Sequence, residues 1–134
     1  MKQGYIHTYK VLTFIVLLAA LIIGSSVFAQ KLLKRDSDKL GKIITEIEKS
    51  SESKNWDQAA SDITKVSEMW SDVKGTWSAL IDHQEIDNID VTLSRLLSLI
   101  QTEEVPSVLS EAAALKKYIE HIPQKEKLDF SNLF

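Results

Sequence analysis

The longest regular pattern of apolar residues in the chain runs from Trp56 to Leu80. Its members are Trp56, Ala59, Ile63, Val66, Trp70, Val73, Trp77 and Leu80. The steps of three and four residues place these side chains on one face of an α-helix, which is typical of a helix packed against others. All three tryptophans of the chain belong to this pattern. We call Trp56, Ile63, Trp70 and Trp77 the tryptophan seam and expect it to lie in the core.

Three other stretches repeat the same spacing and predict three more helices. The apolar positions are Leu33, Leu40, Ile43, Ile44 and Ile47 in residues 31–52; Ile86, Ile89, Leu93, Leu96 and Ile100 in residues 85–102; and Val108, Ala112, Leu115, Ile119 and Ile122 in residues 107–122. With the tryptophan helix, predicted over residues 56–81, this makes four amphipathic helices after residue 30.

Polar residues at the ends of these stretches predict where the helices begin and end. Asn55 is a suitable N-cap for the tryptophan helix, and Asp82 followed by Glu85 resembles a capping pair for the next helix. Ser107 is expected to cap the last helix and Pro123 to end it. The connections are only a few residues long, which predicts antiparallel neighbours and an up-down-up-down four-helix bundle.

The stretch from Val11 to Gln30 has 20 residues and no charge. As a helix it would span about 30 Å, the thickness of the hydrocarbon core of a bilayer. One interpretation is a single transmembrane anchor. The other is a cleaved signal peptide, because Val27 and Ala29 fit a signal peptidase site before Gln30.

The sequence therefore predicts an all-α chain in two parts: residues 1–30 as membrane anchor or signal segment, and residues 31–134 as the helical bundle. The bundle would end in a short apolar tail over residues 128–134 that folds back onto it. We expect the bundle to lie outside the cytoplasmic membrane, because the N-terminus is short and the segment resembles an export signal. Lys31, Lys34 and Arg35 outnumber Lys2 and Lys10, which by the positive-inside rule favours the opposite orientation.

Charge and composition argue against one class of partner and exclude several kinds of site. Residues after 30 hold 14 basic and all 19 acidic side chains, a net charge of −5, so binding to nucleic acid phosphates is disfavoured. The chain has no cysteine, which excludes disulfides, thiolate zinc sites and cysteine nucleophiles.

The candidate chemistry is limited to one polar cluster. His83, Asp87 and Asp90 fall at i, i+4 and i+7, so an imidazole and two carboxylates on one helix face are candidate ligands for a divalent metal. The same acids are also explained as capping and helix-dipole partners in the first turns of a helix. No Glu and His stand three apart as a di-iron bundle requires, so we expect no catalytic residues and no cofactor.

The chain resembles a known bacterial family, domain-of-unknown-function family 4363. The resemblance rests on the apolar N-terminal segment, on Trp70 and Trp77 seven residues apart, on the sequence Asp-His-Gln-Glu-Ile-Asp-Asn-Ile-Asp at 82–90, and on Leu-Asp-Phe-Ser-Asn-Leu-Phe at 128–134. It implies a bacterial, membrane-associated helical protein, and it implies no activity.

Together these features predict a non-enzymatic, membrane-anchored accessory or interaction protein of the cell envelope. Its expected partners are the lipid bilayer and another membrane or envelope protein. The alternative is an extracytoplasmic bundle that senses a ligand or a metal.

Overall fold

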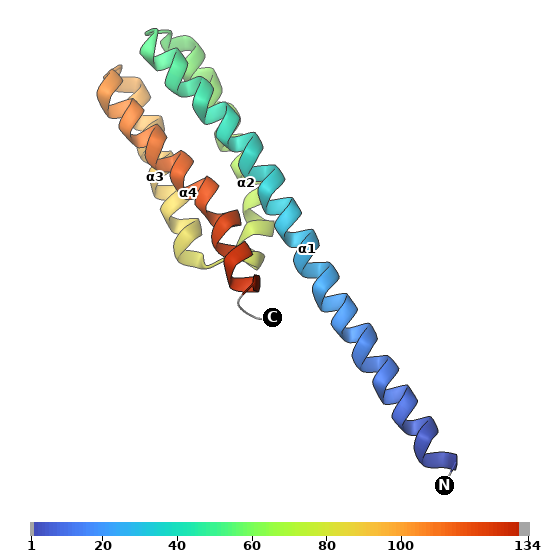
Figure 1. Cartoon of the computed structure of the whole chain (residues 1–134). Coiled ribbons are helices and arrows are strands. Elements are labelled where there is room, and N and C mark those ends of the chain that lie inside the picture. Colours follow the sequence, from blue (N-terminus) through green and yellow to red (C-terminus); the bar gives the residue numbers. More distant parts are fainter. Residues whose placement is uncertain (1, 132–134) are drawn as a thin grey trace. The chain divides into compact units, whose positions relative to one another are not determined.

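The computed structural model describes the backbone of residues 2–131 and the side chains of residues 7–127. Over the described residues the chain forms four helices: α1 (Lys2–Glu52), α2 (Trp56–Leu80), α3 (His83–Thr102) and α4 (Val105–Ser131). It divides into two compact units, with the boundary between Leu32 and Leu33. Figure 1 labels the helices along the chain.

The first unit is the apolar part of α1. Its side chains from 11 to 23 lie open to the surroundings; Phe14 is 66% exposed and Leu21 is 70% exposed. An 18-residue window within His7–Glu52 has a mean hydropathy of 2.7 and none of it is buried. The described residues thus contain one helix that is long and apolar enough to cross a membrane, as a membrane anchor or a signal sequence would be.

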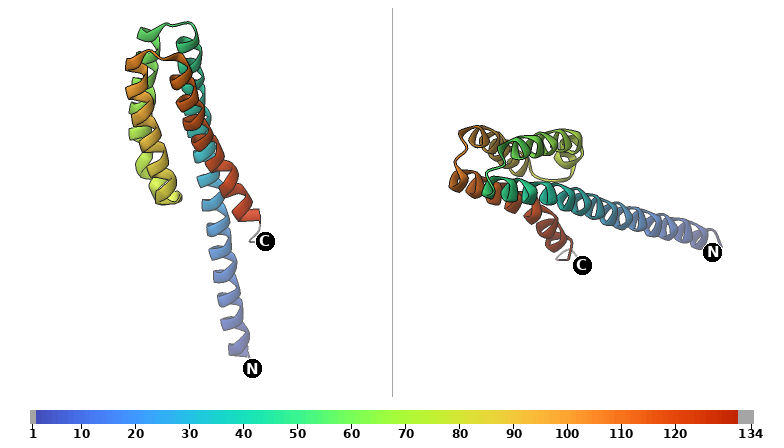
Figure 2. Two further views of the ribbon diagram at one scale, coloured as in Figure 1. Left: turned by 90° about the vertical axis from the view of Figure 1, so that its left-hand side faces the viewer. Right: turned by 90° about the horizontal axis from the view of Figure 1, so that it is seen from above.

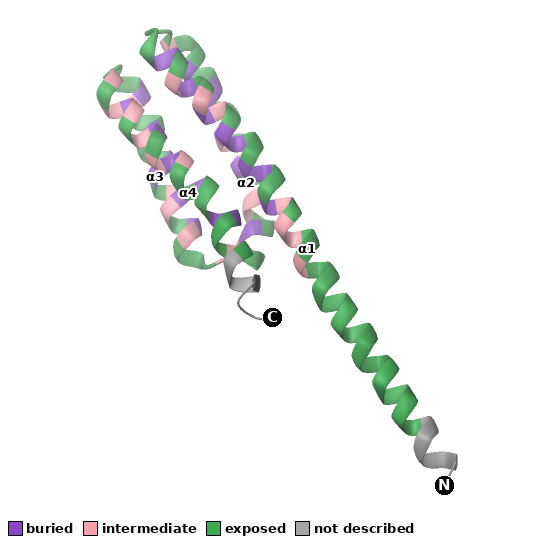
Figure 3. Cartoon of the chain, viewed as in Figure 1, coloured by how far each residue is buried: buried purple, intermediate pink, exposed green. Residues whose placement is uncertain are grey.

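The second unit is the predicted antiparallel bundle, built from residues 33–52 of α1 and from α2, α3 and α4. The buried residues of the four helices, purple in Figure 3, form one continuous core. Trp77, Leu40, Ile44, Leu96 and Ile119 are fully enclosed in it. The all-α, four-helix prediction is confirmed.

The tryptophan helix follows its predicted spacing except at its end. Ile63, Trp70 and Trp77 are buried, Trp56 is partly buried against the core, and Leu80 is 36% exposed. Leu80 is the last residue of α2, and the next residue, Ile81, packs against the core in its place.

Two of the predicted caps are confirmed. The Asn55 side chain accepts a hydrogen bond from Gln58 N at 3.3 Å, and the Asp82 side chain accepts one from Gln84 N at 2.9 Å. These bonds satisfy amide groups that a helix leaves unpaired in its first turn. The break between α2 and α3 lies at Ile81 and Asp82, where the apolar pattern changes phase.

The predicted start of the last helix is wrong by two residues. Helix α4 begins at Val105, so Pro106 occupies its first turn, where a missing N–H costs nothing. Ser107 is therefore not the cap; its hydroxyl donates to Glu104 Oε2 at 3.2 Å.

The predicted end of the last helix is also wrong, because Pro123 lies inside α4, which continues to Ser131. A proline within a helix cannot donate to the carbonyl four residues before it, here that of Ile119. In the bundle the buried hydroxyl of Ser37 donates to Ile119 O at 3.0 Å and takes the place of the missing N–H. Figure 2 shows that α4 changes direction toward its C-terminal end, as expected of a proline-containing helix. The predicted packing of the 128–134 side chains lies outside the described side chains.

Candidate functional site

The most concentrated polar chemistry in the bundle surrounds two tryptophans of the seam. The rings of Trp70 and Trp77 lie 5.4 Å apart at 86°, an edge-to-face arrangement. Trp70 Nε1 donates to Asp90 Oδ1 at 2.7 Å, and Trp77 Nε1 donates to Asp36 Oδ2 at 3.3 Å. A buried indole needs an acceptor for its N–H, and here each acceptor is a carboxylate on a neighbouring helix.

Asp90 of α3 is held by two donors from α2. Besides the Trp70 bond, Lys74 Nζ donates to Asp90 Oδ2. Partial burial would raise the pKa of Asp90, but the hydrogen bonds from Lys74 and Trp70 and the charge of Lys74 together hold it below its ordinary value. Asp90 is therefore ionised at neutral pH and joins α2 to α3.

The structure assigns different surroundings to the three candidate metal ligands His83, Asp87 and Asp90. His83 and Asp87 are exposed, whereas Asp90 is turned toward Trp70 and Lys74. Within the described part of the chain, no group of three or more His, Cys, Asp or Glu side chains could hold a metal ion.

Asp36 is a buried carboxylate that the sequence interpretation overlooked. Its exposed fraction is 2%. Arg35 donates to Asp36 Oδ1 through Nε at 3.1 Å and Nη2 at 3.0 Å, while Trp77 donates to the other oxygen. A signal was present: Leu33 and Leu40 are seven residues apart, and the core position between them falls on Asp36 and Ser37.

Asp62 is a second buried carboxylate, in the second turn of α2. It is 4% exposed, and its Oδ1 accepts from Gln58 Nε2 at 3.0 Å and from Lys65 Nζ at 2.9 Å. Across the described side chains, every fully buried nitrogen or oxygen atom has a hydrogen-bond partner. The fully buried polar atoms of these side chains thus all have partners, some on the same helix and some on a neighbouring one.

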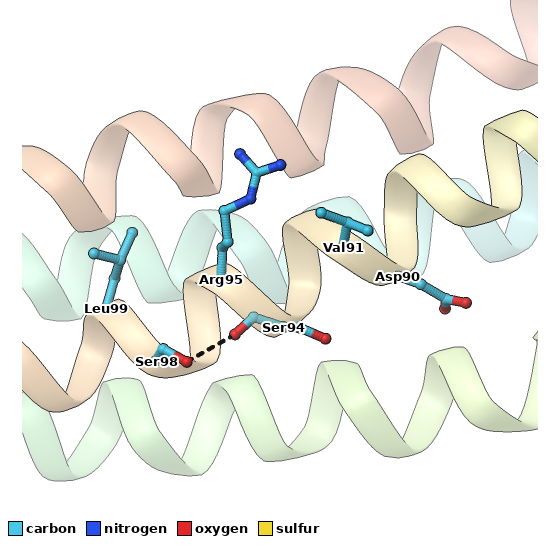
Figure 4. A pocket seen from close by; sticks show the side chains of 6 residues that line it. All are labelled: Asp90, Val91, Ser94, Arg95, Ser98 and Leu99. Atoms are coloured by element: carbon cyan, nitrogen blue, oxygen red, sulfur yellow. Dashed lines mark hydrogen bonds between the residues drawn. The ribbon is translucent and has the colours of Figure 1, made fainter.

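A surface groove with a volume of about 540 Å³ lies along α3. Figure 4 shows its lining side chains, among them Val91, Ser94 and Arg95, arranged along the outer face of α3. Val91 is 50% exposed, and Arg95 makes a 3.5 Å ion pair with Glu111 of α4. The groove is open and mostly apolar, and its charged groups are already paired, so it offers no nucleophile with an adjacent base.

Comparisons with known proteins give a single result. No curated protein matches the chain, and no solved structure matches it. A family model with the description "Domain of unknown function (DUF4363)" matches residues 27–133, which include the whole bundle except its last residue. This match covers more than half of the chain, and it shows that the chain, with its apolar N-terminal helix and four-helix bundle, belongs to the DUF4363 family.

Proposed function

We propose that the protein is a single-pass membrane protein whose bundle lies outside the cytoplasmic membrane and acts as a non-enzymatic accessory protein for another envelope protein. The observation that carries this proposal is the exposed apolar helix at the start of α1. Large apolar side chains in water cost about 25 cal/mol for each Å² of surface, so a helix that is apolar on every side is stable only in a bilayer.

The continuity of α1 favours an anchor over a cleaved signal. The helix runs without a break from Lys2 to Glu52 and therefore through Ala29 and Gln30. Proteases cut most readily where the backbone is exposed and not held in a helix. Cleavage before Gln30 would require this part of α1 to unwind first.

The orientation of the bundle needs its own experiment, because the basic residues after the apolar segment act against the proposed one. The absence of native cysteine makes single-cysteine labelling clean. Ser61→Cys places a thiol on the exposed surface of α2, and Gln3→Cys, before the apolar segment, is the matched control. In intact cells a membrane-impermeant maleimide should label the Ser61→Cys chain and leave the Gln3→Cys chain unlabelled. The reverse result would place the bundle in the cytoplasm.

The accessory role rests on how the bundle uses its polar groups. The buried carboxylates Asp36 and Asp62 and the partly buried Asp90 all accept hydrogen bonds from neighbouring donors, which supports a structural use of the interior. A protein of this kind acts through its surface, by binding.

The test of the accessory role is crosslinking in intact cells followed by extraction in a mild detergent. The full chain should recover one envelope protein reproducibly, whereas a control that joins residues 1–30 to an unrelated soluble domain should not. A chain that stays a partner-free monomer under every crosslinking condition would contradict the proposal.

A further inference from the structure

The first turn of the bundle on α1 lies close to the membrane in the anchored chain that we propose above, and the following inference rests on that proposal. Lys34 is four residues beyond Gln30, the last residue of the uncharged segment, on the same continuous helix. At 1.5 Å per residue this is about 6 Å past the hydrocarbon edge, and the headgroup layer on each side of a bilayer is about 5–8 Å thick. Lys34 is therefore close enough to the apolar segment along the chain to reach the lipid headgroups.

A cavity of about 270 Å³ opens beside Lys34, between α1 and α4. Its buried lining residues are Ser37 and Pro123, the pair that is linked through Ile119 O. Its charged lining residues are Lys34 and Asp38 from α1, with Glu120 and Lys127 from α4. Two ammonium groups and two carboxylates thus share one small cavity.

The charges in this cavity are ordered along the bundle axis. On α1, Asp38 lies four residues beyond Lys34, about 6 Å farther along the bundle from its start at Leu33. Helix α4 runs in the opposite direction, so Glu120 lies about 10 Å farther from that end of the bundle than Lys127. The Glu120 carboxylate is also at the level of Gly41, since a Cβ added there would lie 3.0 Å from Glu120 Oε1. On both walls the lysine is nearer to the end of the bundle that follows the apolar segment in the chain, and the acid is farther from that end.

We propose that this cavity binds the headgroup of a zwitterionic phospholipid that carries a primary amine, such as phosphatidylethanolamine. In this lipid the phosphate lies next to the glycerol, and the ammonium is attached beyond it, farther from the hydrocarbon. The phosphate then meets Lys34 and Lys127, and the ammonium meets Asp38 and Glu120. Both contacts are charge-assisted hydrogen bonds, which are stronger than neutral ones.

The existing contact between Lys34 and Asp38 does not prevent this binding. The two groups form a 3.0 Å ion pair, but their side chains are 69% and 54% exposed. Exposed pairs of this kind contribute little to stability, so the headgroup can replace the pair with one new partner for each group.

The experiment measures which lipid the full chain retains. The chain is purified in detergent, mixed with phosphatidylethanolamine, phosphatidylcholine and phosphatidylglycerol of identical acyl chains, and the retained lipid is counted by native mass spectrometry. We expect phosphatidylethanolamine to be retained about tenfold better than either competitor, as one additional charge-assisted contact provides. Phosphatidylcholine has no ammonium N–H to donate, and phosphatidylglycerol has no ammonium at all.

Two variants and one control locate the site. Lys127→Gln and Glu120→Gln should each lower phosphatidylethanolamine retention about tenfold, and Glu120→Gln should in addition raise the retention of phosphatidylglycerol. Lys117→Gln, an exposed lysine of α4 outside this cavity, should change neither. Circular dichroism on each variant verifies that the helices are intact.

The outcomes that overturn the proposal are distinct from a failure of the anchor. Equal retention of the three lipids, or a preference of the parent chain for phosphatidylglycerol, would overturn the headgroup site. So would equally tight binding of soluble phosphoethanolamine, which would identify a free metabolite as the ligand. Alkaline extraction of cell membranes tests the anchor separately: a chain that stays with the membrane but shows no lipid preference loses only the headgroup site.

Discussion

We infer that the hydrogen bond from Ser37 to Ile119 O lets the bundle tolerate Pro123, and we predict how much it contributes to stability. Ser37 is 3% exposed, and its hydroxyl donates at 3.0 Å to a carbonyl that has lost its usual partner to the proline. In Ser37→Ala this buried carbonyl has no donor, which should cost about 1–3 kcal/mol of unfolding free energy.

The matched change is Pro123→Ala, which restores an N–H four residues after Ile119. In that background Ile119 O is satisfied within the helix, so removal of the Ser37 hydroxyl should cost less than about 0.5 kcal/mol. The two substitutions should therefore be coupled by about 1–2 kcal/mol, although they lie 86 positions apart in the chain.

The assay is denaturant unfolding of the full chain in detergent micelles, followed by tryptophan fluorescence, since every tryptophan of the chain belongs to α2. The parent, both single variants and the double variant complete the cycle, and an unchanged slope with denaturant shows that the same unfolding is measured. Equal costs of Ser37→Ala in the two backgrounds would refute the idea that Ser37 compensates for the proline.

Three further predictions concern the tryptophans and their carboxylates. Trp70→Ala should destabilise the bundle by about 3–5 kcal/mol in the same unfolding assay. The control Leu97→Ala, at an exposed site, should cost less than about 0.5 kcal/mol. A loss below about 1 kcal/mol for Trp70→Ala would show that Trp70 does not lie in the core. The pKa of Asp90 is lower in the folded chain than its unfolded-state value of about 3.9, so ionised Asp90 stabilises the fold above that pH. This contribution is lost as the pH falls through the folded-state pKa. The parent and Asp90→Asn should therefore differ in stability at pH 7 and converge as the pH falls below about 4. A stability difference that does not change with pH would contradict this. Asp36→Ala leaves the Trp77 indole without an acceptor and should lower the unfolding free energy by about 1–3 kcal/mol. Asp36→Asn keeps an oxygen at that position and should lower it less. The opposite order in thermal or denaturant unfolding would rule out the indole bond as the reason for the buried acid.

The elements of the bundle were predictable because apolar spacing records which face of a helix is buried. The phase change near Asp82 placed the break between α2 and α3, and the polar side chain of Asn55 marked the start of α2. These signals are local in the sequence, and local signals are what a single sequence expresses most clearly.

The features that were missed depend on contacts between distant residues. Pro123 was expected to end a helix, and it does not because Ser37, on another helix, satisfies the carbonyl of Ile119. Asp36 was overlooked because a carboxylate at a core position becomes acceptable only when Trp77 and Arg35 are known to reach it. Such compensation can be seen only once the helices have been placed side by side.

The candidate site was the least predictable part of the chain. His83, Asp87 and Asp90 share a helical spacing, but the orientation of Asp90 is decided by donors on α2. The charged cavity between α1 and α4 combines residues from the two ends of the bundle sequence, so no local spacing in the sequence predicts it.

The central claim is that the apolar part of α1 holds the bundle at the membrane, and the most direct measurement is the N-terminal sequence and membrane partition of the mature protein from its own cells. We expect the residues before Val11 to be present and the protein to stay in the membrane pellet after alkaline extraction. A mature protein that begins at Gln30 and is recovered in the soluble fraction would contradict the account and identify the apolar helix as a signal peptide.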